Sequence, residues 1–355
     1  MSEVVQHTIG ASMPRGLLNP NVDSGRLKLK AETFTLGAWT LTKVNQPLLM
    51  DRVEQVELSE RLSEWVAVFP KTPANLTQQE EGVPSALVRF DYTYTPRLRI
   101  GPQIYEIEER PAGMGIAAVL NGKFRDGFVR SVEFWQKRFK KELAVCISDE
   151  RAGTSDDEFW AATLLRQPIR VCKGVPPPED LCRYIWWPRT SRHESAYYGL
   201  TPHSLSTNEL EGDKSYGVSM GLWHHIGRPS DISFRGGCAL KPKAGSRFEN
   251  IQLVGPGAQH AKGCISIQRA LREIGEGKFA YWQPYHEPER TAQHPWLLPD
   301  YHLIRRVYFA YSAPSVGAPR YLCLGGCWMA TPTARVHGTT ETLTGPIYPH
   351  TLEWL

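Results

Sequence analysis

The spacing of hydrophobic and polar residues predicts a chain that mixes strands and helices. Apolar and polar residues alternate over residues 86–119, most clearly at Val88-Arg-Phe-Asp-Tyr and Ile104-Tyr-Glu-Ile-Glu, and this alternation predicts strands. Charged periodic stretches over residues 51–67 and 128–141 predict helices. The overall pattern therefore favours an α/β protein.

The middle of the chain has a strand–helix rhythm. Residues 143–148 predict a short buried strand and residues 155–165 a helix, which together make a βα unit and indicate a small parallel sheet. A similar rhythm runs through residues 183–187 to a predicted helix over residues 216–225.

Composition excludes several classes of protein. The 355 residues are 41% hydrophobic and 22% charged, which argues against a disordered or coiled-coil chain. Lys and Arg number 41 and Asp and Glu 37, so the net charge of +4 lacks the dense basic stripe of a dedicated nucleic-acid binder.

The sequence also predicts a cytoplasmic location. No stretch reaches the roughly 18 consecutive apolar residues of a membrane-spanning helix, and the first residues lack the apolar core of a secretory signal. The seven cysteines are scattered and odd in number, so we expect buried thiols rather than disulfides.

Three carboxylates are expected on one strand face. Glu106 and Glu108 are two residues apart and therefore point the same way, whereas Tyr105 and Ile107 should face the core. Asp91 joins the two glutamates if its strand pairs antiparallel with theirs. Such carboxylates repel one another unless a cation such as Mg²⁺ neutralises them. A solvated sheet face is the alternative interpretation.

Two later segments carry candidate ligand-binding groups. Lys241 ends an apolar strand and precedes a glycine-containing turn, which leads to a further predicted strand at residues 251–254. The N–H groups of this turn could face phosphate oxygens, but the turn taken alone favours a plain hairpin. Gln283 lies in a strand interrupted by prolines over residues 279–288, which is typical of a linker or an edge strand. Gly325 and Gly326 interrupt a further strand and predict a bulge.

In their order along the chain, these segments resemble the ATP-grasp ligases of the permuted glutathionylspermidine synthetase branch. The resemblance covers roughly residues 85–350 and does not extend to residues 1–80 or to an amidase domain. The matching motifs are Arg89-Phe90-Asp91, Glu106-Ile-Glu108 (where the family has E-x-N), Asp213-Lys214 with Leu222-Trp223, Lys241-Pro-Lys-Ala-Gly245-Ser246-Arg247, Tyr281-Trp-Gln283, Gly326-Cys-Trp328 with Pro332 and Arg335, and Tyr348-Pro349-His350.

The resemblance implies an α/β (α+β) ATP-grasp fold with a small parallel α/β pre-ATP-grasp subdomain in permuted order. The implied divisions are residues 1–80, which stay unassigned, 81–125 for the metal-binding strands, 126–210 for the small subdomain, and 211–355 for the nucleotide-binding part.

The implied activity is that of an ATP-dependent carboxylate–amine ligase, which forms an amide through an acyl phosphate and releases ADP and phosphate. Its substrates would be small or peptide-like acids and amines, and a polymer-borne substrate is compatible. The implied roles are catalysis for Arg89 and Arg247, ATP binding for Lys214, Lys241, Gly245, Ser246 and Gln283, ligation of two Mg²⁺ ions for Asp91, Glu106 and Glu108, and substrate binding for Arg335.

Two other classes of function stay open. Glu108 in place of asparagine and the irregular loop 244–250 are compatible with a nucleotide-binding or regulatory protein that no longer catalyses ligation. The basic stretch 130–141 and Trp186-Trp187 suggest a nucleic-acid-binding module, but such helices are usually solvated faces and such tryptophans are usually packed. His224, His225 and His286 lack partners at ligand spacing and are interpreted as capping or packed residues.

Overall fold

The fold is taken from a computed structural model. It describes residues 31–36, 39–68, 85–95, 100–108, 111, 113–148, 169–172, 184–189, 216–242, 251–255, 264–291, 301–312, 320–333 and 342–354. Three sheets and their helices account for most of these residues, and the general α/β class expected from the sequence is confirmed.

The largest sheet has nine strands in the order β1-β2-β17-β16-β15-β4-β5, with β14 paired to β15 and β3 to β17. Its strands are β1 (Ala31–Leu36), β2 (Trp39–Val44), β3 (Leu48–Leu49), β4 (Ser85–Thr95), β5 (Ile100–Glu108), β14 (Glu289–Arg290), β15 (His302–Ser312), β16 (Arg320–Thr331) and β17 (Leu343–Tyr348). Segments more than 200 residues apart in sequence therefore lie side by side in its centre, where β4 pairs antiparallel with β15.

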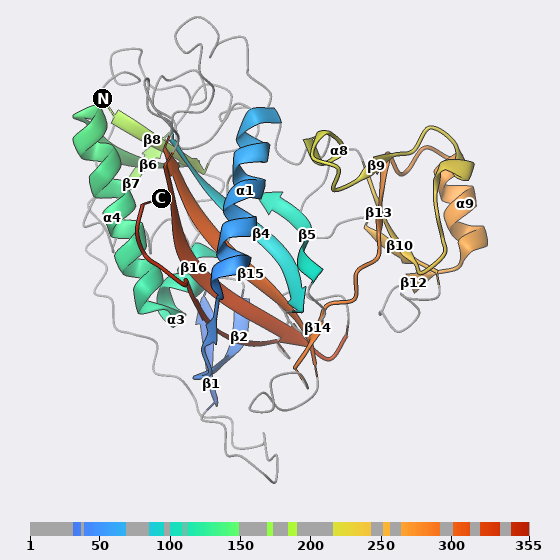
Figure 1. The fold of residues 1–355 in the computed structure, drawn as a ribbon, viewed down its shortest axis with the longest axis horizontal. Helices are drawn as coiled ribbons and strands as arrows, with labels where there is room; N and C mark the ends of the chain where they lie inside the picture. The colour runs from blue at the N-terminus through green and yellow to red at the C-terminus, as the bar shows by residue number, and fades with distance from the viewer. Residues whose placement is uncertain are drawn as a thin grey trace, which may run out of the picture.

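Helices cover both faces of the large sheet (Figure 1). Helix α1 (Arg52–Val68) packs on one face, and α3 (Met114–Leu120) and α4 (Gly122–Phe139) pack on the other. The central strand β15 is buried along its whole length, as expected of a strand covered on both sides.

Alternation along β4 separates an apolar face from a charged one. Val88, Phe90 and Tyr92 join the core beneath α1. Arg89 and Asp91 point to the opposite face, which they share with Tyr308 of β15 in the core beneath α3 and α4. The charged residues that the sequence singled out therefore lie on one face of the sheet.

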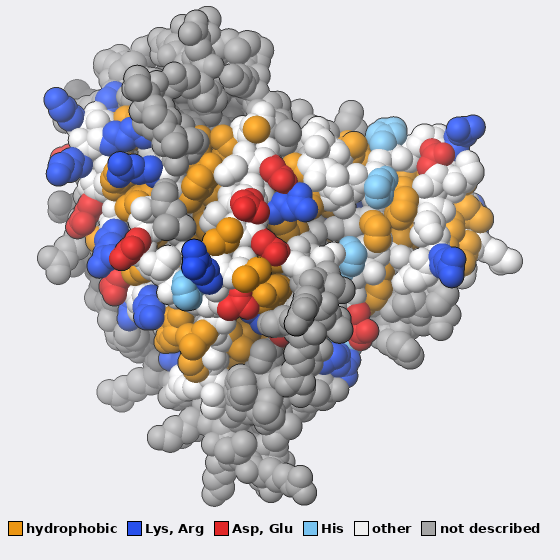
Figure 2. Space-filling view, in the orientation of Figure 1, with side chains coloured by type: hydrophobic (Ala, Val, Ile, Leu, Met, Phe, Trp, Pro, Cys, Tyr) orange, Lys and Arg blue, Asp and Glu red, His pale blue; other side chains and the backbone are white. Residues whose placement is uncertain are grey.

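The second sheet has five strands in the order β12-β11-β10-β13-β9. Its strands are β9 (His224–His225), β10 (Cys238–Lys241), β11 (Gln252–Val254), β12 (Cys264–Ile265) and β13 (Tyr281–Pro284). Helix α9 (Ile267–Gly275) packs its Ala270 and Ile274 on this sheet. The resulting lobe projects from the larger one (Figures 1 and 2). The predicted strands on either side of the lysine turn are confirmed as the antiparallel pair β10–β11.

The third sheet is parallel, as the strand–helix rhythm predicted. It pairs β6 (Glu142–Ser148) with both β7 (Ile169–Cys172) and β8 (Tyr184–Arg189). The helix predicted over residues 155–165 lies outside the described residues.

The helix predicted over residues 216–225 is wrong beyond its first turn. Helix α8 spans only Tyr216–Ser219, and the chain then turns into strand β9. Gly221 has a φ of +66°, which ends the helix. The indole of Trp223 folds back onto Gly217, where a Cβ atom would lie 2.1 Å from the ring. Only glycine at position 217 leaves room for this ring, so Trp223 packs against α8 where the prediction had placed further helical turns.

The N-terminal segment, which the sequence left unassigned, belongs in part to the large sheet. β2 and β3 both pair parallel with β17, near the other end of the chain. α1 lies across the face of the same sheet and contributes Leu58, Leu62 and Trp65 to its core.

Two simpler expectations are also tested. Cys238, Cys323 and Cys327 are free and buried, and Cys264 is free and partly buried, so these four confirm the prediction of unpaired thiols. Among the described residues, no helix is both long enough and apolar enough to cross a membrane.

Asn121 ties the start of α4 to the centre of the large sheet. Its side-chain oxygen accepts a 3.0 Å hydrogen bond from the N–H of Phe124 and so caps the helix. Its amide nitrogen donates to the carbonyl oxygens of Gly326 at 3.1 Å and Ile347 at 2.6 Å. The residue is completely buried, so all three bonds form away from water.

We expect Asn121→Ala to lower the free energy of unfolding by about 3 kcal/mol, because it removes a cap and leaves two buried carbonyls unpaired. The control is Ser266→Ala at the exposed N-cap of α9, where the Ser266 hydroxyl accepts from Arg269 N–H. That variant should cost about 1 kcal/mol. Urea denaturation followed by circular dichroism measures both, and equal losses would contradict the role given to Asn121.

Candidate functional site

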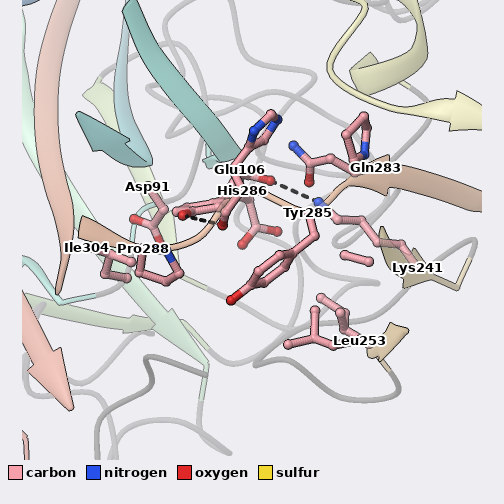
Figure 3. A pocket seen from close by; sticks show the side chains of 13 residues that line it. Asp91, Glu106, Lys241, Leu253, Gln283, Tyr285, His286, Pro288 and Ile304 are labelled. Carbon is pink, nitrogen blue, oxygen red and sulfur yellow. Dashed lines mark hydrogen bonds between the residues drawn. The ribbon is translucent and has the colours of Figure 1, made fainter. Parts of the chain in front are cut away.

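A cavity lies where the small sheet meets the large one. It encloses about 740 Å³ of empty space, a volume that includes space open to solvent. The large sheet contributes Asp91, Tyr105, Glu106 and Ile304, and the small-sheet lobe contributes Ala239, Lys241, Ile251, Leu253 and Gln283. Residues 284–288 connect the two and are here called the crossing segment. They contribute Pro284, Tyr285, His286 and Pro288. Figure 3 shows Asp91 and Ile304 on one side of the cavity and Lys241 and Leu253 on the other.

A bulge in β5 orients two consecutive residues toward this cavity. Asp91 pairs with Glu106, but the next residue, Tyr92, pairs with Ile104, so Tyr105 is an extra residue in β5. Ile104 and Ile107 both remain in the core beneath α1. Tyr105 packs against a core cluster that includes Ile304, but the bulge places it in the cavity wall beside Glu106 and not, as expected, on the face opposite Glu106.

The predicted carboxylate face is confirmed, and arginines lie among its carboxylates. β4 and β5 pair antiparallel, so Asp91 is opposite Glu106 and Arg89 is opposite Glu108. The guanidinium of Arg89 donates to both oxygens of Asp91 at 2.7 and 3.0 Å. It also lies 2.6 Å from a carboxylate oxygen of Glu108. From β15, a nitrogen of Arg306 lies 3.4 Å from Asp91.

These contacts fix the charge of Arg89. Burial lowers the pKa of its guanidinium, but the carboxylates of Asp91 and Glu108 raise that pKa by more, so it stays well above its ordinary value. Arg89 is therefore a permanent positive charge that holds the side chains of β4 and β5 together.

The small sheet reaches β5 through two side chains. The ammonium of Lys241 donates to the carbonyl oxygen of Tyr105 at 2.9 Å, and the amide of Gln283 donates to that of Ile104 at 2.8 Å. The Lys241 ammonium also lies 4.1 Å from the ring centroid of Trp223, a cation–π distance. Both residues are more than nine-tenths buried, which gives the lysine a fixed position in the cavity wall.

The crossing segment supplies a tyrosine and a histidine to the cavity. The hydroxyl of Tyr105 donates to the carbonyl oxygen of His286 at 2.9 Å. Burial, followed by the nearby carboxylate of Glu287, raises the pKa of Tyr285 to about 12, so its hydroxyl keeps its proton. Burial also lowers the pKa of His286, which favours the neutral imidazole at neutral pH.

No protein-family model matches this chain, and no curated protein is similar to it in sequence.

The carboxylates fit magnesium only in part. Among the described residues, no three histidine, cysteine, aspartate or glutamate side chains are grouped as metal ligands would be. Asp91 and Glu106 do line the cavity, and Mg²⁺ commonly uses one or two carboxylates together with phosphate oxygens of a ligand. Glu108 is paired with Arg89 and does not line the cavity, so the described geometry supports Asp91 and Glu106 as ligands more than Glu108.

Of the residues proposed from the sequence, six are described and gather at this place. Asp91, Glu106, Lys241 and Gln283 line the cavity, and Arg89 and Glu108 lie next to Asp91. The others, Lys214, Gly245, Ser246, Arg247 and Arg335, lie outside the described residues.

Sequence reasoning missed Arg306, Tyr105 and Tyr285. Two consecutive arginines within an otherwise apolar strand, Arg305 and Arg306, were a usable signal, because alternation sends one of them to each face of the sheet.

We expect Arg89→Met to lower the free energy of unfolding by on the order of 3 kcal/mol, because the carboxylates of Asp91 and Glu108 lose their shared partner. Arg89→Lys should lower the free energy of unfolding by less, because lysine keeps the positive charge and loses only the forked pair of hydrogen bonds. Arg61→Met removes an exposed pair with Glu64 and should cost under about 0.5 kcal/mol. Guanidinium chloride titrations compare the three, and similar values for Arg89→Met and Arg61→Met would refute the interpretation.

Proposed function

We propose that the protein is an ATP-dependent carboxylate–amine ligase with an ATP-grasp fold. The supporting observation is the cavity itself, where Lys241 and Gln283 of one sheet meet Asp91 and Glu106 of another. These residues come from four separate segments of the chain, and each was expected at such a site from the resemblance of its motif.

The cavity offers suitable surroundings for both parts of a nucleotide. Ile251, Leu253 and the ring of Tyr285 form apolar walls on which a base can pack. Lys241 provides a positive charge at a fixed position, as phosphate-binding lysines do. Lys214, Gly245, Ser246 and Arg247 complete the proposed phosphate contacts through the resemblance alone.

The charge balance of the site supports a metal ion that arrives with the nucleotide. Three carboxylates, Asp91, Glu106 and Glu108, are matched by three cations, Arg89, Arg306 and Lys241. A triphosphate would add strong negative charge to this nearly neutral set. We propose that Asp91 and Glu106 hold Mg²⁺. For Glu108, which is paired with Arg89 outside the cavity lining, the role of ligand to a second ion follows from the resemblance alone. When bound, Mg²⁺ neutralises charge on the β- and γ-phosphate oxygens.

The proposed reaction has two steps. A carboxylate oxygen of the acid attacks the γ-phosphorus, the bond between the γ-phosphorus and its bridging oxygen breaks, and ADP leaves. An amine nitrogen then attacks the carbonyl carbon of the acyl phosphate, loses a proton and expels inorganic phosphate. The protein's contribution is to position the reactants and to stabilise charge. Arg89 and Arg247 would stabilise the developing negative charge, and Arg335 would bind a substrate carboxylate.

The proposed substrates are small or peptide-like acids and amines, and a polymer-borne acid or amine also fits. We propose a cytoplasmic location, where ATP is abundant and the free thiols of Cys238, Cys323 and Cys327 would stay reduced.

A second candidate is a nucleotide-binding protein that does not catalyse ligation. The observation in its favour is the ion pairing of Arg89 with Asp91 and Glu108, which occupies carboxylate oxygens that a metal would otherwise use. The two candidates share ATP binding and differ in ADP formation.

Hydroxylamine trapping separates these candidates. The protein is incubated with Mg²⁺, ATP and pools of carboxylic acids, and hydroxylamine replaces the amine. A ligase gives a hydroxamate and an equal amount of ADP. ATP binding without hydroxamate or ADP from any pool would favour the second candidate, and absence of ATP binding would refute both.

Lys241→Met should weaken ATP binding about tenfold, because it keeps the apolar stem but removes the charge that faces the phosphates. The measurement is the rise in melting temperature caused by Mg²⁺–ATP, taken for each variant relative to its own ligand-free value. Lys278→Met removes a lysine paired with Glu276 on the surface and should leave this rise unchanged. An undiminished rise in Lys241→Met would contradict the phosphate-binding role.

Glu106→Gln should reduce ADP formation by about 100-fold, because the amide lacks the charge that Mg²⁺ requires. Its melting temperature should stay close to that of the wild type, since Glu106 lies in a cavity wall and not in the core. Glu60→Gln, at an exposed position on α1, is the control. Unchanged turnover in Glu106→Gln would refute the metal-binding assignment.

A further inference from the structure

Behind the cavity, on the α1 face of the large sheet, Arg305 lies between two buried carboxylates. Its guanidinium donates to Glu289 through two nitrogens, each at 3.1 Å, and to Glu54 of α1 at 2.8 Å. The three side chains are at most 3% exposed. This cluster is separate from the ion pairs of Asp91, which lie on the opposite face of the same strands.

Glu289 is the residue at which the crossing segment joins the large sheet. It follows Pro288 directly, begins β14 and pairs with Leu303 of β15. Its backbone N–H donates to the hydroxyl of Thr93 at 2.8 Å. The side chain and the backbone of Glu289 are therefore both held by the large sheet, immediately after the residues that form a wall of the cavity.

The crossing segment is held in its middle and through the residues that flank it on both sides. Directly before its first residue, Gln283 of β13 is opposite Ala239 of β10 in the small sheet. In its middle, the carbonyl of His286 accepts a hydrogen bond from Tyr105. Directly after its last residue, Glu289 is held by Arg305. The first two contacts belong to the cavity, and the third is a buried pair of opposite charges behind it.

A buried ion pair contributes little to stability when compared with apolar packing of the same volume, because both charges lose their hydration. The forked pairing of guanidinium and carboxylate does fix direction and distance. The main effect of the Arg305–Glu289 pair is therefore on geometry, at the place where the chain passes from one sheet to the other.

We propose that Arg305 and Glu289 are positioning residues, which fix the crossing segment and thereby set the affinity of the cavity for its nucleotide. The part that concerns nucleotide affinity rests on the proposed function. The part that concerns the crossing segment is tested without any ligand.

Glu54 provides an internal comparison. One of its oxygens accepts from both Tyr92 and Arg305, and the other has no hydrogen-bond partner among the described residues. Burial raises its pKa, against the opposing effects of Arg305 and Tyr92. Two carboxylates share one guanidinium here. With Glu54 neutral, Glu289 would be the carboxylate of this cluster that balances the charge of Arg305. Glu54→Gln keeps the accepting oxygen and should therefore change the crossing segment little.

The experiment compares Glu289→Gln with Glu273→Gln. Glu273 is also buried and paired with an arginine, Arg269 at 2.8 Å, but it lies on α9. Hydrogen–deuterium exchange of the ligand-free proteins follows the amides of residues 285–287, and calorimetry with a non-hydrolysable ATP analogue and Mg²⁺ gives the dissociation constant.

We expect Glu289→Gln to speed amide exchange at residues 285–287 about tenfold and to raise the dissociation constant of the analogue about tenfold. Neither change is expected in Glu273→Gln. Unchanged exchange, or a change equal to that in Glu273→Gln, would overturn the proposal, as would faster exchange with unaltered affinity. If the wild type binds no analogue, the proposed function fails and the exchange data alone decide the positioning role. Should Glu289→Gln not fold, Arg305→Lys replaces it and is judged by the same criteria, because the lysine keeps the charge without the fork.

Discussion

Strand β4 pairs with β5 on one side and with β15 on the other, and the arrangement of the site follows from this double pairing. It brings Asp91 next to Glu106 on one side and next to Arg306 on the other. Carboxylates so close together in a buried face need compensating charge, and Arg89, two residues before Asp91 on the same strand face, supplies part of it. The local sequence of β4 thus carries both the acid and its counter-ion.

The same strands carry charge on their other face, which limits how they can pair. Arg305 is in register with Tyr92, and both contact Glu54 of α1. A shift of β15 by one residue would exchange the two faces, so that Arg306 would meet the core beneath α1 and Arg305 would meet Asp91. Two ion clusters that differ in their partners therefore specify the register of a strand that is buried along its whole length.

Features that depend on local periodicity could be predicted from the sequence. The alternation around Arg89 and around Glu106 predicted two strands with their acids on a common face, and the antiparallel pairing confirms it. The parallel sheet around residues 143–148 followed from the βα rhythm, and the bulge at Gly325 from its glycines. In each case, neighbouring residues determine the outcome.

Features that depend on distant contacts could not be predicted. The bulge at Tyr105 arises from the register with β4, and the early end of α8 arises from Trp223 packing on Gly217. The approach of Arg306 to Asp91 joins segments that are 215 residues apart, which no local pattern reveals. For the same reason, the sequence indicated a metal beside the three carboxylates, and Arg89 on their strand face, but not Arg306. The site residues outside the described ranges remain predictions.

The position of β5 at the end of the large sheet has one more consequence. Among the described strands, β5 has a neighbour only on its β4 side, and a free strand edge is a place where another chain can add. Here the carbonyl groups of Ile104 and Tyr105 are occupied by Gln283 and Lys241 instead. The contact between the lobes thus also shields an aggregation-prone border, and a motion that separated the lobes would uncover it.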